Sequence, residues 1–211
     1  MSVPKPVPAS SVVALRSDPE LRVLMVRRAQ RSRSWAGLWV YPGGRVEAGE
    51  SARDAALREL FEETGILLGS SVHTRADLAS AREALNSGAV SFHQVLARLG
   101  ASVELERLVT WARWVTPSAE KRRFDARFFV CDLSDVEPGL LDDASSDELE
   151  TSDSSWMVPA SVLKDNREGR LSLAPPTLRI LEELRNCGRA DICLERAARR
   201  PKATILPRFL P

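Results

Sequence analysis

Residues 43–66, GGRVEAGESARDAALRELFEETGI, join a glycine pair to a glutamate-rich run that closes with Thr-Gly-Ile. Ser51 precedes Asp54 by three residues, which is the spacing of a capping box at a helix N-terminus. Gly65 suits the left-handed residue that often ends a helix. These signals predict one helix over residues 52–64, directly after the glycine pair.

The predicted helix has an acidic side and an apolar side. Carboxylates three and four residues apart repel one another and would destabilise a bare helix by about 0.2–0.5 kcal/mol per pair. Hard divalent cations such as Mg²⁺ and Mn²⁺ prefer carboxylate oxygen and share their coordination shell with substrate phosphates. The acidic side is therefore a candidate metal platform. Its residues are Glu59, Glu62 and Glu63, and the apolar side carries Leu57, Leu60 and Phe61.

A glutamate-rich helix alone is more often a solvated surface, so the spacing of the whole stretch matters. Gly44 is followed by five residues and Glu50, and then by seven residues and the run Arg58-Glu59-Leu60-Phe61-Glu62-Glu63-Thr64-Gly65-Ile66. This pattern resembles the Nudix box, the signature of the Nudix hydrolases. The resemblance implies the α/β fold of that family, an α/β/α sandwich with a mixed β-sheet.

The resemblance also implies roles for individual residues. In Nudix hydrolases the positions of Glu59, Glu62 and Glu63 hold Mg²⁺ or Mn²⁺. The positions of Arg58 and Glu50 mainly orient the helix and its loop. The implied reaction is hydrolysis of a diphosphate linkage in a nucleoside diphosphate joined to another moiety, by a metal-activated water that displaces one phosphate in line.

Two features of the chemistry stay open at this point. The general base could be one of the box glutamates, Glu120, or a residue of the acidic segment from Asp142 to Glu150. A bend through Gly43 and Gly44 would bring backbone N–H groups toward a bound phosphate, so both glycines are candidate substrate contacts.

The segment before the box carries a second resemblance. Its spacing is similar to the signature of the coenzyme A diphosphatase branch, from which Met25, Val26 and Tyr41 depart. Residues 114–129, WVTPSAEKRRFDARFF, are also similar to the peroxisomal coenzyme A diphosphatases, in which a Trp-x-Thr-Pro turn precedes an Arg-Phe-Asp strand. The implied reaction cleaves coenzyme A or acyl-CoA to 4′-phosphopantetheine and 3′,5′-ADP. The positions that fit the first signature are Arg28, Ala29, Arg33, Gly37 and Pro42.

Coenzyme A carries a 3′-phosphate besides its diphosphate, and guanidinium groups bind phosphate oxygens in bidentate fashion. We therefore expect Arg28 or Arg33 to bind substrate, with Arg31 as a further candidate; the alternative is a basic surface loop. Trp35 or Trp39 either stacks on adenine or packs in the core.

Two other functions fit the same sequence. One is a Nudix diphosphatase for ADP-ribose, another nucleotide sugar or a dinucleotide. The other is a catalytically silent Nudix module that senses a nucleotide or binds a protein. The intact glutamates of the box favour an enzyme over the silent module.

The length of 211 residues predicts a single domain over residues 1–211. We expect it to contain a helical insertion at about 74–108 and a basic, proline-containing tail at about 196–211. Apolar runs predict a strand hairpin at 11–15 and 21–26, further strands at 39–41, 108–115, 127–131 and near 156–158, and a helix that begins at Pro175.

The overall charge excludes some partners. Thirty basic and 29 acidic residues give a net charge of +1, so no global field would draw the protein to nucleic acid or to an anionic membrane. The N-terminus does not resemble a signal peptide, and Cys131, Cys187 and Cys193 form no paired disulfide pattern, which predicts a cytoplasmic location. The expected partner is a small nucleotide-diphosphate substrate, and a homodimer is left open.

Overall fold

The central strand of the fold is β1 (Val7–Ser17), in which residues 12–15 are completely buried. The structure, a computed structural model, describes residues 3–30, 35–69, 73–136 and 151–207. β1 pairs antiparallel with β2 (Leu21–Arg28) across the short turn that follows Ser17. The predicted hairpin is confirmed.

Among the described residues, six further strands join β1 and β2 in one mixed sheet of eight strands. The order is β3-β2-β1-β6-β5-β8, while β4 pairs with β1 and β7 pairs with β2. The pairs β1–β6 and β5–β8 are parallel, and the other pairs are antiparallel. These strands are β3 (Trp39–Val40), β4 (Gly43–Arg45), β5 (Val109–Val115), β6 (Phe124–Asp132), β7 (Thr151–Met157) and β8 (Thr204–Ile205).

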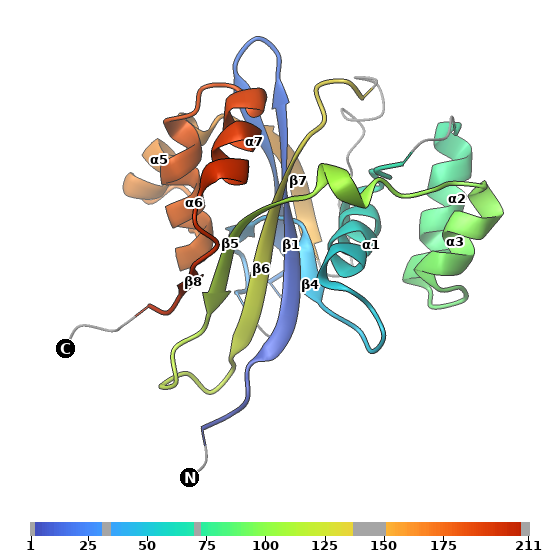
Figure 1. Ribbon diagram of the computed structural model, residues 1–211, viewed down its shortest axis with the longest axis horizontal. Helices are drawn as coiled ribbons and strands as arrows, with labels where there is room; N and C mark the ends of the chain where they lie inside the picture. Colours follow the sequence, from blue (N-terminus) through green and yellow to red (C-terminus); the bar gives the residue numbers. More distant parts are fainter. Residues whose placement is uncertain (1–2, 31–34, 70–72, 137–150, 208–211) are drawn as a thin grey trace.

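Helices cover both faces of the sheet (Figure 1). Alternate residues of β1 point to opposite faces, so Val12 and Ala14 pack in one hydrophobic cluster, whereas Val13 and Leu15 pack in another. The first cluster includes α1 (Ala52–Thr64), α2 (Arg75–Asn86) and α3 (Phe92–Leu99), and the second includes α5 (Pro159–Arg167), α6 (Pro175–Arg185) and α7 (Ala190–Arg199). This arrangement is the predicted α/β/α sandwich.

Helix α1 has the predicted bounds. The side chain of Ser51 accepts the backbone N–H of Asp54, the Asp54 carboxylate accepts the N–H of Ser51, and Gly65 closes the helix at φ 76°. Ser10 of β1 donates its hydroxyl to the carbonyl of Ala52 at 2.5 Å. The start of the helix is therefore attached to the central strand.

Helices occupy the segment for which we predict a helical insertion. Its described residues form α2, α3 and a 3₁₀ turn, η1 (Leu105–Arg107). Phe92 of α3 packs against Phe61 of α1 with ring centroids 6.2 Å apart, and Leu85 of α2 joins the same hydrophobic cluster. The insertion therefore packs on the helix that carries the Nudix box.

Three predictions about local structure need correction. Gly43 and Gly44 lie in strand β4, paired with β1, rather than in a bend that ends a strand. Helix α5 was not expected. Residues 196–199 belong to α7 instead of a tail, because α7 buries Ala190, Cys193 and Ala197 against the sheet.

Two further predictions can be compared with the described residues. The three cysteines are free thiols, and burial raises the pKa of Cys131 to about 12, which makes it unreactive. Within the described ranges, no helix combines the length and the apolar character that crossing a membrane requires.

Candidate functional site

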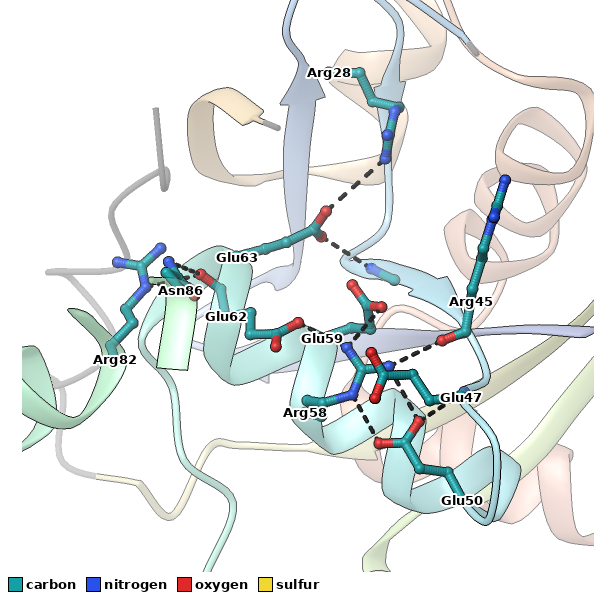
Figure 2. Close-up of polar contacts among 11 residues, drawn as sticks. Arg28, Arg45, Glu47, Glu50, Arg58, Glu59, Glu62, Glu63, Arg82 and Asn86 are labelled. Carbon is teal, nitrogen blue, oxygen red and sulfur yellow. Dashed lines mark hydrogen bonds and ion pairs between the residues drawn. The ribbon is translucent and has the colours of Figure 1, made fainter. Parts of the chain in front are cut away.

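The acidic side of α1 lies against β4 (Figure 2). Glu63 accepts the backbone N–H of Gly43 at 2.9 Å. Gly44 lies close to Glu59, since a Cβ added at Gly44 would be 2.3 Å from a carboxylate oxygen of Glu59. Residues that are separated by 15 to 20 positions in the chain are thus brought into direct contact.

The two glycines of β4 are needed because they lack side chains. Both lie outside the left-handed region that favours glycine, so their freedom in φ is not used. A Cβ on Gly43 would be 2.2 Å from the hydroxyl of Ser11 and 2.7 Å from its Cα. Gly43 lets β4 approach the central strand, whereas Gly44 leaves room for a carboxylate.

Arg58 is the centre of the polar network on α1. Its guanidinium donates to Glu50 at 2.7 and 3.1 Å, to Glu59 at 3.0 Å and to Glu62 at 2.7 Å. It also donates to the carbonyl of Arg45 at 2.9 Å. Arg58 therefore connects the helix to the end of β4 and to the loop that carries Glu50.

Burial and charge act on this network in opposite directions. Burial alone would lower the pKa of Arg58, but the hydrogen bond to Glu50 and the charges of Glu59 and Glu62 raise it above its ordinary value. For Glu62, burial and the charges of Glu47 and Glu50 raise the pKa above its ordinary value, although Arg58 lowers it. One guanidinium is shared among three carboxylates, so it compensates Glu62 only in part.

Glu63 points away from this network, toward β2. Its side chain is 4% exposed, and one carboxylate oxygen lies 3.9 Å from Nη1 of Arg28. Arg28 is held in the sheet because its backbone N–H donates to Leu38. The structure thus brings Arg28 to the acidic face of α1, while Arg33 and Arg31 lie outside the described residues.

The three glutamates are close along α1, but their side chains take different partners. Within the described ranges, no three His, Cys, Asp or Glu side chains form a group that could hold a metal ion as placed. The convergence of carboxylates that we expected is therefore not present in this arrangement. The physical reason is that Arg58 attracts Glu59 and Glu62, whereas Gly43 and Arg28 attract Glu63.

The donor set nevertheless fits a hard divalent cation. It offers carboxylate oxygens alone, from side chains separated by three and four residues on one helix. Gly44 leaves the Glu59 carboxylate room beside β4. The pKa of Glu62 stays raised by burial and by the charges of Glu47 and Glu50 although Arg58 lowers it, and a bound cation would favour its ionised form.

The candidate adenine-stacking tryptophans and the candidate general bases differ in how buried they are. Trp39 is buried in the core, which supports packing, whereas Trp35 is 46% exposed and has a positive φ of 58°. Glu120 is exposed in the connection between β5 and β6. The acidic segment from Asp142 to Glu150 lies outside the described residues.

Sequence reasoning missed three residues near the site. Glu47 donates its backbone N–H to Glu50 at 3.0 Å, and its charge contributes to the raised pKa of Glu62. Arg82 and Asn86 of α2 reach the carbonyl of Glu62. Glu47 lies inside the Nudix box and could have been considered, but no local pattern marks the two α2 residues.

Comparisons with known proteins place the chain among Nudix proteins. The family described as the NUDT19 Nudix domain matches residues 51–184. Putative nudix hydrolase 7 of Caenorhabditis elegans is 28% identical over 190 residues, which cover 88% of this chain and 62% of that protein. Acyl-coenzyme A diphosphatase NUDT19 of Xenopus laevis is 22% identical over 232 residues, with coverage of 78% and 60%. The chain thus spans about three fifths of the length of these two relatives.

A solved structure supports the same assignment. A NUDIX hydrolase from Alicyclobacillus acidocaldarius superposes with a TM-score of 0.73 and 25% identity, covering 92% of this chain and 97% of that one. The matched family region includes all of α1, α2, α3 and α5 and nearly all of α6, whereas α7 lies beyond it. Since the family match extends over more than half of the sequence, the chain belongs to the Nudix hydrolase family.

Proposed function

We propose that this protein hydrolyses a diphosphate linkage with the help of Mg²⁺ or Mn²⁺ held by Glu59, Glu62 and Glu63. The observation that carries the proposal is the position of Glu59 and Glu63 against the backbone of β4, with Glu62 beside them on the same helix. When bound, the divalent ion supplies charge neutralisation for the diphosphate and activates a water. The water oxygen forms a bond to one phosphorus, and the bridging P–O bond breaks.

The other residues of the site bind and orient. Arg58 and Glu50 hold α1 at a fixed distance from the loop before it, through two hydrogen bonds. Arg28 is a planar cation close to Glu63, and such a group binds phosphate oxygens that lie next to a metal site. We assign Arg28, Gly43 and Gly44 to the substrate side of the site, with Arg33 as a further candidate.

We infer that the substrate is coenzyme A or an acyl-CoA, cleaved to 4′-phosphopantetheine and 3′,5′-ADP. Two observations support this choice. The residues before the box fit the spacing of the coenzyme A diphosphatase branch. The match to the NUDT19 Nudix domain and the similarity to the Xenopus acyl-coenzyme A diphosphatase support the same branch.

The test is a substrate panel analysed by mass spectrometry. Coenzyme A, an acyl-CoA, ADP-ribose, a nucleotide sugar and a dinucleotide are each incubated with Mg²⁺ or Mn²⁺, with a chelator control. We expect 3′,5′-ADP from coenzyme A, and none with the chelator. Faster cleavage of ADP-ribose, a nucleotide sugar or a dinucleotide would replace the substrate proposal, and no turnover of any diphosphate would identify a silent module.

The glycines of β4 provide an internal comparison. In Gly44→Ala the new Cβ displaces the flexible Glu59 carboxylate, so we expect turnover to fall roughly 10- to 100-fold with little loss of stability. In Gly43→Ala the Cβ meets the backbone of β1, so we expect the free energy of unfolding to fall by about 1–3 kcal/mol. Denaturant unfolding and initial rates measure both; the opposite pattern would contradict the assigned roles.

A further inference from the structure

The carbonyl oxygen of Glu62 receives two hydrogen bonds from the helical insertion. Carbonyl groups in the last turn of a helix have no N–H partner within that helix, so they accept hydrogen bonds from other donors. The carbonyls of Leu60 and Phe61 accept locally, from the hydroxyl of Thr64 and the N–H of Gly65. For Glu62 the donors come from α2, as Figure 2 shows.

The two donors are side chains that share one face of α2. Arg82 donates from Nε at 2.8 Å, and Asn86 donates from Nδ2 at 3.3 Å. Because they are four residues apart, they lie one above the other on the helix. The Thr74–Asp77 capping box defines the start of α2, and buried Leu85 joins the hydrophobic cluster that contains α1. Both donors therefore come from an element packed against the site.

Charge adds to these hydrogen bonds. The C-terminal end of a helix carries partial negative charge and favours a nearby cation. Helix α1 has no basic residue in its last turn. Arg82 supplies that cation from another helix, and it lies against the residue that ends α1: a Cβ at Gly65 would be 3.6 Å from Cδ and Nη1 of Arg82.

The carbonyl of Glu62 also belongs to the peptide group that joins two of the candidate metal ligands. The C=O of Glu62 and the N–H of Glu63 belong to the same peptide group, which is planar. Donors that hold this carbonyl therefore fix the orientation of the peptide group between two of the three glutamates on the acidic side. Without these donors, the Glu62 carbonyl would lose its protein partners in the turn of the helix where fraying begins.

We propose that Arg82 and Asn86 are positioning residues that set the direction of the Glu62 and Glu63 side chains for divalent-ion binding. The proposal rests on the proposed function, because it takes these glutamates as metal ligands. It gives the helical insertion a role in the reaction: α2 holds the end of the helix that carries the ligands.

The experiment measures Mn²⁺ binding to the protein without substrate, by the electron paramagnetic resonance signal of free Mn²⁺. We expect Arg82→Ala to weaken Mn²⁺ binding by about 10- to 100-fold, the usual effect of removing an outer partner of a metal site. We expect a smaller loss in Asn86→Ala and partial recovery in Arg82→Lys, which keeps a cation. Raising the Mn²⁺ concentration should restore part of the lost turnover in Arg82→Ala.

The matched control is Arg98→Ala, which removes an exposed arginine from α3 of the same insertion and should leave Mn²⁺ affinity unchanged. Thermal unfolding checks each variant, and Arg82→Gln replaces Arg82→Ala if the alanine variant does not fold. Wild-type Mn²⁺ affinity in a folded Arg82 variant would overturn the positioning role alone. Failure of the wild-type protein to bind Mn²⁺ or to cleave any diphosphate would overturn the proposed function and this inference together.

Discussion

Arg58→Met is expected to lower the free energy of unfolding by about 3–5 kcal/mol, the usual cost of removing one partner from a buried ion pair. The Arg58 side chain is 7% exposed and is shared among Glu50, Glu59 and Glu62. Methionine has a similar length, so the loss reports uncompensated carboxylates rather than a large cavity. Urea unfolding of both proteins measures the difference.

An exposed ion pair between an arginine and an aspartate of the sheet provides the control. Arg113 forms two hydrogen bonds with Asp125, but its side chain is 43% exposed. Arg113→Met should therefore cost less than about 1 kcal/mol, because exposed ion pairs contribute little. Equal losses in Arg58→Met and Arg113→Met would contradict the view that the three carboxylates of α1 depend on a buried guanidinium.

Glu63→Gln is expected to reduce metal-dependent turnover by roughly 100- to 1,000-fold. A metal ion contributes several kcal/mol of charge stabilisation, and each 1.36 kcal/mol corresponds to about a tenfold change in rate. Glutamine has nearly the same shape, and its amide oxygen can still accept the N–H of Gly43. The fold should therefore persist, as circular dichroism and thermal unfolding would show.

Glu195→Gln is the matched control for this charge removal. Glu195 is exposed on α7, which packs on the face of the sheet opposite α1. Its loss should leave turnover within about twofold, since surface substitutions have small effects. Full activity in Glu63→Gln, at subsaturating Mg²⁺ and Mn²⁺, would remove Glu63 from the proposed ligands.

The elements with strong local signals were predictable from the sequence. The hairpin of β1 and β2 follows from two apolar runs that flank a turn, and α6 begins at the predicted Pro175. Helices α5 and α7 were missed, although α5 begins with Pro159 just as α6 begins with Pro175. The N-cap of α7 makes no side-chain hydrogen bond, so no capping residue marks its start.

Part of the candidate site was likewise predictable from the sequence, and part was not. The Nudix box identified the glutamates, Arg58 and Glu50, because their spacing lies within one continuous stretch. It did not determine how the charges would be shared. Arg58 donates hydrogen bonds to Glu59 and Glu62, whereas Glu63 accepts the backbone N–H of Gly43 and lies near Arg28. These choices depend on where β2 and β4 lie relative to α1.

The sequence alone determined the bounds and the two sides of α1. Both are local properties. A capping box begins the helix, a left-handed glycine ends it, and helical periodicity places the glutamates opposite the apolar residues. Only the tertiary structure decided that Gly44 leaves room for Glu59 and that α2 holds the carbonyl of Glu62. The physical reason is that these contacts join residues 15 to 24 positions apart through packing, which leaves no local pattern in the chain.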